Sequence, residues 1–197
     1  MMKERPEILV VSPIRPRQMD QLAAEFTLHR LDRSSDPERF LADIAARITA
    51  IVTTGSAGAL TALVDSLPNL QLIATSSVGV DKIDLDACRA RGIIVANTPD
   101  VLTDDVADLA FGLVMTTQRR LIEADVWVRS GAWAEQGAFP LTTSLSDQRV
   151  GILGLGATGQ AISCRCAAFR MHVAYCIRQR RQTSKLPYFS TPEALAA

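Results

Sequence analysis

The glycine-rich segment Arg149–Gly159 constrains the fold most strongly, because its glycines stand at fixed spacing between a strand-like and a helix-like run. Its sequence is Arg-Val-Gly-Ile-Leu-Gly-Leu-Gly-Ala-Thr-Gly, and a second strand-like run follows the helix-like one. In a strand–turn–helix unit, Gly154 permits the tight turn and Gly156 lets the backbone approach a pyrophosphate. Gly159 lets helix and strand pack closely. The segment therefore predicts a dinucleotide-binding turn, and the alternative is a purely structural turn.

Strand-like and helix-like runs alternate through the first half of the chain. The strand-like runs are residues 8–12, 27–31, 50–54, 70–76 and 93–97. Helical segments separate them, and one begins at the start signal Asp36-Pro37-Glu38. Five strands joined by helices favour a parallel sheet covered on both faces. We therefore expect an α/β fold.

The alternation stops after Asn97, and residues 102–129 are predicted to form one long apolar helix. Asp104 and Asp105 near its start suit the positive end of a helix dipole. This change predicts a domain boundary, with residues 1–98 in a first domain and residues 99–197 in a second. The second domain is expected to hold two strands of its parallel sheet within this chain.

Charge and cysteine content narrow the possible partners. The 197-residue chain has 21 Lys and Arg residues and 21 Asp and Glu residues, so its net charge is zero. No nucleic acid or membrane is therefore expected as a partner, and no apolar run reaches the roughly 20 residues of a membrane helix. The charged N-terminus lacks a signal-peptide pattern. Four cysteines without ligand-like neighbours predict free thiols, no metal site and a cytoplasmic protein.

Three stretches resemble the D-isomer-specific 2-hydroxyacid dehydrogenases in order and spacing. They are Ser77–Asp81, Asn97–Asp108 and Val150–Gly156. Within that family, the sequence is most similar to the glyoxylate and hydroxypyruvate (including hydroxyphenylpyruvate) reductase branch, because of Asn-Thr-Pro-Asp-Val-Leu-Thr-Asp from residue 97 and Arg-Ser-Gly-Ala-Trp from residue 129. The resemblance implies a flavodoxin-like substrate domain and a Rossmann cofactor domain, with the active site between them. It also implies a homodimer formed around the long helix.

The resemblance implies a substrate site in the loop after the strand at 70–76. This loop holds the substrate carboxylate in the family, so Val78 and Gly79 are the predicted contacts. Glycine allows backbone N–H groups to turn toward a carboxylate without a charged side chain. Ser56, in a second loop of small residues, is a further candidate. The alternative is an ordinary strand-to-helix turn.

The residues after the second strand of the cofactor domain predict a preference for NADPH over NADH. An NAD-preferring domain would carry Asp or Glu there, whereas this chain has Ile-Arg-Gln-Arg-Arg from residue 177. A guanidinium can bind a 2′-phosphate through paired charged hydrogen bonds. Arg178 is the predicted main contact, with Arg180 or Arg181 in support, and the alternative is a solvated basic loop. The predicted cofactor-binding residues are Gly154, Leu155, Gly156, Ala157, Thr158, Gly159, Ile177, Arg178, Gln179 and Arg181.

One position departs from the family pattern, because many relatives have Arg where this chain has Ala157. The family's catalytic Arg, Glu and His are expected in later parts of the cofactor domain, beyond this sequence, so no catalytic residue is predicted within it. His29 and His172 do not match the family's acid and are expected to be structural. Two hypotheses follow: a 2-keto acid reductase whose C-terminal part is missing, or a non-catalytic nucleotide-binding or dimerisation module.

Overall fold

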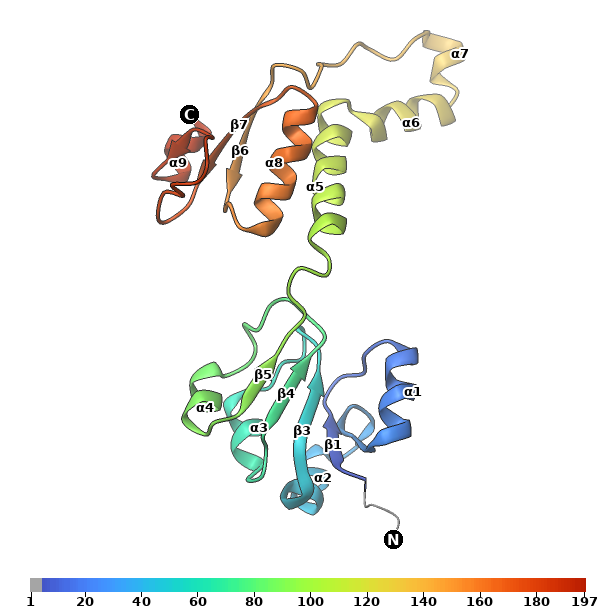
Figure 1. Cartoon of the computed structure of the whole chain (residues 1–197). Helices are drawn as coiled ribbons and strands as arrows, with labels where there is room; N and C mark the ends of the chain where they lie inside the picture. The colour runs from blue at the N-terminus through green and yellow to red at the C-terminus, as the bar shows by residue number, and fades with distance from the viewer. Residues whose placement is uncertain (1–4) are drawn as a thin grey trace. The chain divides into compact units, whose positions relative to one another are not determined.

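The computed structural model describes residues 5–197, and the chain divides into two units, Met1–Val101 and Leu102–Ala197 (Figure 1). We call them unit 1 and unit 2. Residues 1–4, part of the N-terminus in which no signal peptide is expected, lie outside the described residues.

Within residues 5–101, unit 1 is built around a five-stranded parallel sheet. The strands are β1 (Glu7–Val10), β2 (Thr27–Arg30), β3 (Ile48–Thr53), β4 (Leu72–Thr75) and β5 (Ile94–Ala96). Their order, β2-β1-β3-β4-β5, is the flavodoxin-like order. Because every pairing is parallel, the carboxyl ends of the strands meet at one edge of the sheet. The predicted α/β fold with a parallel sheet is confirmed.

One face of this sheet packs against α1 (Pro16–Glu25). Leu22 of this helix packs against a buried cluster of Ile8, Val10 and Val52. These strand residues alternate with residues that point to the opposite face, as the two-residue period of a strand requires. Both faces of the sheet are therefore apolar.

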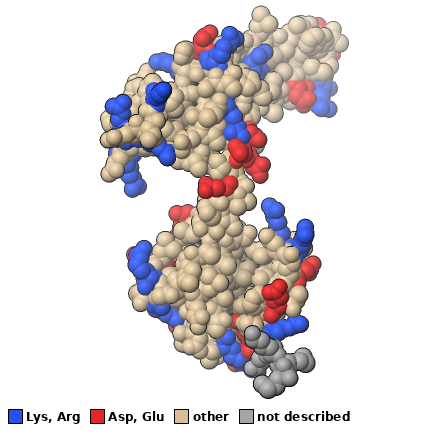
Figure 2. All heavy atoms as spheres, viewed as in Figure 1, with Lys and Arg blue, Asp and Glu red and all other residues tan. Residues whose placement is uncertain are grey.

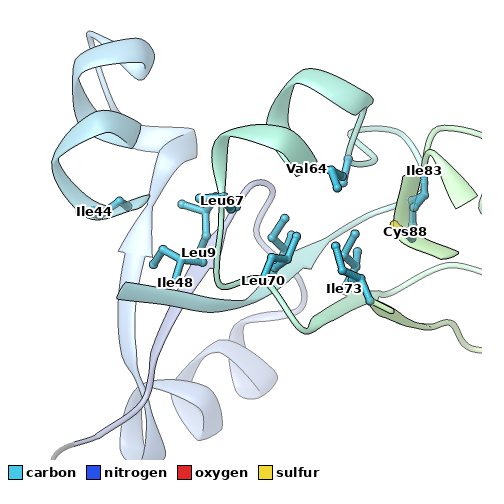
Figure 3. Packing of buried hydrophobic residues seen from close by; sticks show 12 residues of the cluster. Leu9, Ile44, Ile48, Val64, Leu67, Leu70, Ile73, Ile83 and Cys88 are labelled. Atoms are coloured by element: carbon cyan, nitrogen blue, oxygen red, sulfur yellow. The ribbon is translucent and has the colours of Figure 1, made fainter. Parts of the chain in front are cut away.

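The other face carries the larger core (Figure 3). The helices on this side are α2 (Pro37–Ile44), α3 (Thr61–Ser66) and α4 (Leu85–Ala90), and the short 3-10 turns are η1 (Leu31–Arg33) and η2 (Ala45–Arg47). Ile44, Val64 and Cys88 from the helices join Leu9 and Ile73 from the strands in one buried cluster. Burial raises the pKa of the Cys88 thiol, in keeping with its role as an apolar filler.

Aspartate side chains fix the start of two helices in unit 1. The Asp36 carboxylate accepts the N–H of Arg39 at 3.1 Å, as the Asp-Pro-Glu start signal predicts. The Asp84 carboxylate accepts the N–H of Ala87 at 2.9 Å, and this bond is the main reason why the pKa of Asp84 is lowered. Both carboxylates thereby satisfy helix N–H groups that have no partner within the helix.

In residues 102–197, unit 2 contains a three-stranded parallel sheet in the order β6-β7-β8. The strands are β6 (Arg149–Leu153), β7 (His172–Cys176) and β8 (Tyr188–Phe189). The prediction of two strands is therefore wrong. β8 has only two residues, which pair with Tyr175 and Cys176, so its sequence is too short to show the alternation of a strand.

Helices α5 and α8 lie side by side in unit 2 (Figure 1). The helices of this unit are α5 (Thr103–Gln118), α6 (Leu121–Arg129), α7 (Ala132–Gln136), α8 (Ala157–Ala168) and α9 (Pro192–Ala196). The Phe111 and Phe169 rings are 4.6 Å apart between centroids. Arg165 of α8 binds Asp108 at 2.6 Å and Asp104 at 3.1 Å, both on α5. Aromatic packing and ion pairs therefore join the two helices.

The predicted single helix over residues 102–129 is wrong, because α5 and α6 are separate helices. Arg120 between them has φ 50° and ψ 42°, a left-handed conformation that interrupts the helix. Its guanidinium pairs with Glu123, one turn into α6. Neither glycine nor proline marks this position, so the apolar composition gave no sign of the break.

Among the residues that the structure describes, none of the helices combines the length and the apolar character needed to cross a membrane.

Candidate functional site

The glycine-rich turn connects β6 to α8. Gly154 has a φ of 101°, a conformation that favours glycine. Its N–H donates to the carbonyl oxygen of Cys176, the last residue of β7, at 2.9 Å. Gly156 is the N-cap of α8. The turn is therefore fixed where β6 and β7 both end, at the carboxyl edge of the sheet.

Gly159 and Gly156 differ in what surrounds them. A Cβ on Gly159 would overlap the carbonyl group of Gly154 and would lie 3.3 Å from Cγ2 of Ile152. Only glycine therefore lets α8 lie this close to the turn. A Cβ on Gly156 would meet no atom within 4 Å. The backbone at Gly156 is open to an outside group, which is what a bound pyrophosphate requires.

The first N–H groups of α8 lie beside this open backbone. In the part of the chain that the structure describes, the N–H groups of Gly156, Ala157 and Thr158 have no acceptor. Such groups carry the partial positive charge of a helix N-terminus, which favours an anion. The residues present therefore fit the phosphates of a dinucleotide, although Ala157 adds no charged side chain.

The basic segment directly follows β7. Arg178, Gln179 and Arg180 are exposed, and in the view of Figure 2 Lys and Arg atoms without acidic neighbours lie over the C-terminal part of unit 2. Arg181 has a different environment, because its Nη1 donates to the carbonyl oxygen of Leu155 at 2.7 Å. The structure thus brings Arg181 to the glycine turn and leaves Arg178 exposed to solvent.

A small hollow of about 170 Å³ lies beside the turn. It is lined by Leu155, Gln160, Ser163, Cys164, Arg181, Thr183, Ser184 and Leu186. Two of the predicted cofactor-binding residues, Leu155 and Arg181, are among them. The hollow is therefore formed jointly by the glycine turn, α8 and the loop after β7.

In unit 1, the structure brings Ser56 close to the predicted substrate loop. The two loops follow β3 and β4, at the carboxyl edge of the sheet. The Lys82 Nζ donates to the carbonyl oxygen of Ser56 at 2.7 Å. A Cβ on Gly55 would overlap the side chain of Ser77, so the loops are in direct contact.

The carbonyl groups of Val78 and Gly79 both accept hydrogen bonds from side chains. Asn97 Nδ2 donates to Val78 O at 2.8 Å, and Ser77 Oγ donates to Gly79 O at 3.0 Å. The N–H groups of Val78 and Gly79 have no acceptor within residues 5–197, and both residues are exposed. Gly79 does not have a positive φ, but a Cβ there would come within 3.1 Å of Asp81 Oδ2. The loop therefore presents free backbone donors.

Sequence reasoning missed the side chains that hold these loops. Asn97 and Lys82 were given no role, although each fixes a loop carbonyl. Thr54 begins the predicted loop of small residues that contains Ser56, and its hydroxyl is 3.3 Å from Ser12 Oγ and 3.1 Å from Ser56 Oγ. A signal for Asn97 existed, because a polar residue directly after a parallel strand lies at the edge where the neighbouring loops begin.

His29 is held by charged side chains, whereas His172 is exposed. His29 Nε2 lies 2.6 Å from Glu7 Oε2, and Arg47 Nε donates to the same oxygen at 2.9 Å. The Arg47 hydrogen bond is the main cause of the lowered pKa of Glu7, and His29 acts in the same direction. His172 begins β7, at the opposite end of the strand from Cys176, which contacts the glycine turn.

A larger hollow of about 480 Å³ lies between α1 and the sheet of unit 1. It is lined by Ile14, Gln18, Gln21, Leu22, Glu25, Phe26, Val52, Ala74, Thr75, Ser76 and Thr98. The Thr75 hydroxyl is buried without a hydrogen-bond partner among the described residues. None of the predicted site residues lines this hollow.

The chain belongs to the D-isomer-specific 2-hydroxyacid dehydrogenase family. Residues 8–197 match the family described as "D-isomer specific 2-hydroxyacid dehydrogenase, catalytic domain". The chain is 42% identical over 190 residues to hydroxyphenylpyruvate reductase of Plectranthus scutellarioides, covering 96% of this chain and 60% of that protein. It is 43% identical over 189 residues to a glyoxylate/hydroxypyruvate reductase of Arabidopsis thaliana, with the same coverage. The predicted family and branch are confirmed.

Solved structures agree with this assignment. A 2-hydroxyacid dehydrogenase from Ketogulonicigenium vulgare is 41% identical, with a TM-score of 0.92 over 98% of this chain and 61% of that one. An NADPH-dependent glyoxylate/hydroxypyruvate reductase from Sinorhizobium meliloti, in complex with NADP and malonate, is 40% identical, with a TM-score of 0.84 over 98% of this chain and 60% of that one. The chain spans about 60% of the length of the curated relatives it matches.

Replacement of Gly159 by alanine tests the close approach of α8 to the turn. We expect Gly159→Ala to lower the free energy of unfolding by about 3 kcal/mol, because its Cβ overlaps backbone that cannot easily move. Gly156→Ala is the matched control and should cost less than about 1 kcal/mol, because its Cβ meets open space. Urea denaturation of the two variants measures both values. Equal stability of Gly159→Ala and the wild type would contradict the close approach.

Proposed function

We propose that the whole protein reduces a small 2-keto acid, such as glyoxylate or hydroxypyruvate, to the D-2-hydroxy acid with NADPH. The observation that carries the proposal is the glycine turn, where the backbone at Gly156 is open and the N–H groups at the start of α8 have no acceptor among the described residues. The names of the similar reductases from Plectranthus scutellarioides, Arabidopsis thaliana and Sinorhizobium meliloti support this reaction class. In this proposal, residues 1–98 form the substrate domain and residues 99–197 the first part of the cofactor domain.

The cofactor is assigned to the turn and to the loop after β7. The N–H groups of residues 156–158 would bind the pyrophosphate, and Gly154 and Gly159 give the turn its shape. The reduced nicotinamide supplies a hydride when it is bound. This chain's own residues bind and orient the cofactor.

The choice of NADPH rests on Arg178. No carboxylate occupies residues 177–181, where Asp or Glu would repel a 2′-phosphate. The exposed guanidinium of Arg178 can pair with that phosphate, supported by Arg180 or Arg181, while Ile177 and Gln179 flank the adenosine. The NADPH dependence named for the Sinorhizobium meliloti relative supports the same choice.

The substrate carboxylate is assigned to the N–H groups of Val78 and Gly79, with the Ser56 hydroxyl as a further contact. The exposure of these residues and the absence of internal acceptors for the two N–H groups within residues 5–197 support this assignment. Proton donation is assigned to no residue of this part of the chain. His29 is held by Glu7, and His172 lies at the far end of β7 from the glycine turn.

A homodimer is proposed through α6 and α7. Ile122, Val126 and Val128 of α6 are 68%, 59% and 57% exposed, and Trp133 of α7 is 55% exposed. An apolar surface of this kind is typical of a protein–protein contact.

A cytoplasmic location is proposed as well, because all four cysteines are free thiols, as a reducing compartment favours.

The cofactor assignment is tested by titrating the purified protein with NADPH and with NADH. We expect the wild type to bind NADPH at least about tenfold more tightly than NADH. Arg178→Ala should bind NADPH about tenfold more weakly and NADH unchanged, since only NADPH carries the 2′-phosphate. Arg89→Ala, which removes an exposed arginine of unit 1, should change neither affinity. Equal affinity of the wild type for both cofactors would overturn the preference.

A turnover assay distinguishes the proposed reductase from a non-catalytic module. NADPH oxidation by the whole protein with glyoxylate or hydroxypyruvate supports the proposed activity. Tight NADPH binding without turnover of any tested 2-keto acid would favour the non-catalytic nucleotide-binding or dimerisation module.

The homodimer is tested by replacing two exposed residues of α6. We expect the Ile122→Glu/Val126→Glu double variant to sediment as a monomer where the wild type sediments as a dimer, because two buried carboxylates would strongly oppose association. Ile94→Glu, at an exposed apolar position of unit 1, is the control and should leave the dimer intact. A wild type that sediments as a monomer at all concentrations would contradict the proposal.

A further inference from the structure

Arg181 is joined to the middle residue of the glycine turn. Its Nη1 donates to the carbonyl oxygen of Leu155 at 2.7 Å, across 26 positions of sequence. Leu155 stands between Gly154 and Gly156 and is only 3% exposed. A side chain from the loop after β7 thus holds the backbone of the turn itself.

The backbone of Arg181 is fixed by a buried tyrosine. The Tyr175 hydroxyl accepts the Arg181 N–H at 3.2 Å and lies 3.4 Å from the Arg181 carbonyl oxygen. Tyr175 is fully buried in β7, and its ring packs against that of Tyr188 at 5.5 Å between centroids. The Tyr188 hydroxyl donates to the carbonyl oxygen of Ile177 at 3.3 Å. Hydrogen bonds from the hydroxyl groups of Tyr175 and Tyr188 therefore hold the loop that starts at Ile177.

The bond to Leu155 determines where the next N–H points. In a planar trans peptide, the C=O of one residue and the N–H of the following residue point in opposite directions. The carbonyl of Leu155 points to Arg181, so the N–H of Gly156 points away from it. That N–H has no acceptor among residues 5–197, and the space beside Gly156 is open.

We propose that Arg181 is a positioning residue that fixes the Leu155–Gly156 peptide and so directs the Gly156 N–H toward the cofactor's pyrophosphate. Its support for cofactor binding is then indirect, whereas Arg178 contacts the 2′-phosphate. This inference rests on the proposed function. The pyrophosphate is common to NADPH and NADH, so loss of the Arg181 side chain affects both cofactors equally.

The affinities of Arg181→Ala for NADPH and NADH test this role. We expect both to fall by about tenfold, because the Gly156 N–H is no longer held toward the pyrophosphate, with the ratio between them unchanged. Tyr175→Phe, which removes only the hydroxyl that holds Arg181, should weaken both by a smaller common factor. Arg181→Lys keeps a donor for Leu155 and should restore most of the affinity. Gln182→Ala, an exposed change in the same loop, is the control and should have no effect.

Loss of NADPH affinity alone in Arg181→Ala would overturn the inference, because it would make Arg181 a 2′-phosphate ligand. Unchanged affinity for both cofactors would overturn it as well. Both results leave the proposed function standing. A wild type that binds neither cofactor would instead overturn the proposed function, and this role for Arg181 with it.

Amide hydrogen exchange of the cofactor-free protein gives a second readout. Arg181→Ala should speed exchange of the Gly154 amide, which donates to the carbonyl oxygen of Cys176, and of the Arg181 amide, which donates to the Tyr175 hydroxyl, because one bond joins the two segments. Unchanged exchange of the Gly154 amide would show that the bond does not order the turn, and would overturn the inference.

Discussion

The contact between Gly159 and the carbonyl group of Gly154 is the constraint on which the rest of unit 2 depends. Because no side chain separates them, α8 begins directly against the end of β6. Its first N–H groups, which have no acceptor within residues 5–197, therefore lie beside the open backbone of Gly156. The same placement lets α8 reach α5, where Arg165 pairs with Asp104 and Asp108. The contact between Gly159 and Gly154 thus supports the packing of α8 against α5 and also places the N–H groups that could bind an anion.

In both candidate sites, a side chain from another segment donates a hydrogen bond to a carbonyl group of the loop. Asn97 holds the carbonyl of Val78 in unit 1, and Arg181 holds the carbonyl of Leu155 in unit 2. In each case the next N–H, of Gly79 or Gly156, is left facing away. Fixing a backbone donor in this way avoids the entropy cost of ordering it when an anion binds.

The sequence predicts those structural features that depend on residues close together in the chain. Strand and helix runs of unit 1 appear as apolar alternation, and the roles of Gly154 and Gly159 follow from their spacing. The break at Arg120 and the strand β8 were missed, because a left-handed arginine and a two-residue strand have no local pattern. The bonds from Arg181 and Asn97 were missed because they join residues 26 and 19 positions apart, and only the folded chain brings such groups together.

The most direct test of the central claim is an amide chemical-shift titration of the isotopically labelled protein with NADP⁺. The account predicts the largest shifts in unit 2 at Gly156, Ala157 and Thr158, because their N–H groups are the free donors at the start of α8. Saturable binding that leaves these three amides unshifted would place the cofactor elsewhere and contradict the account.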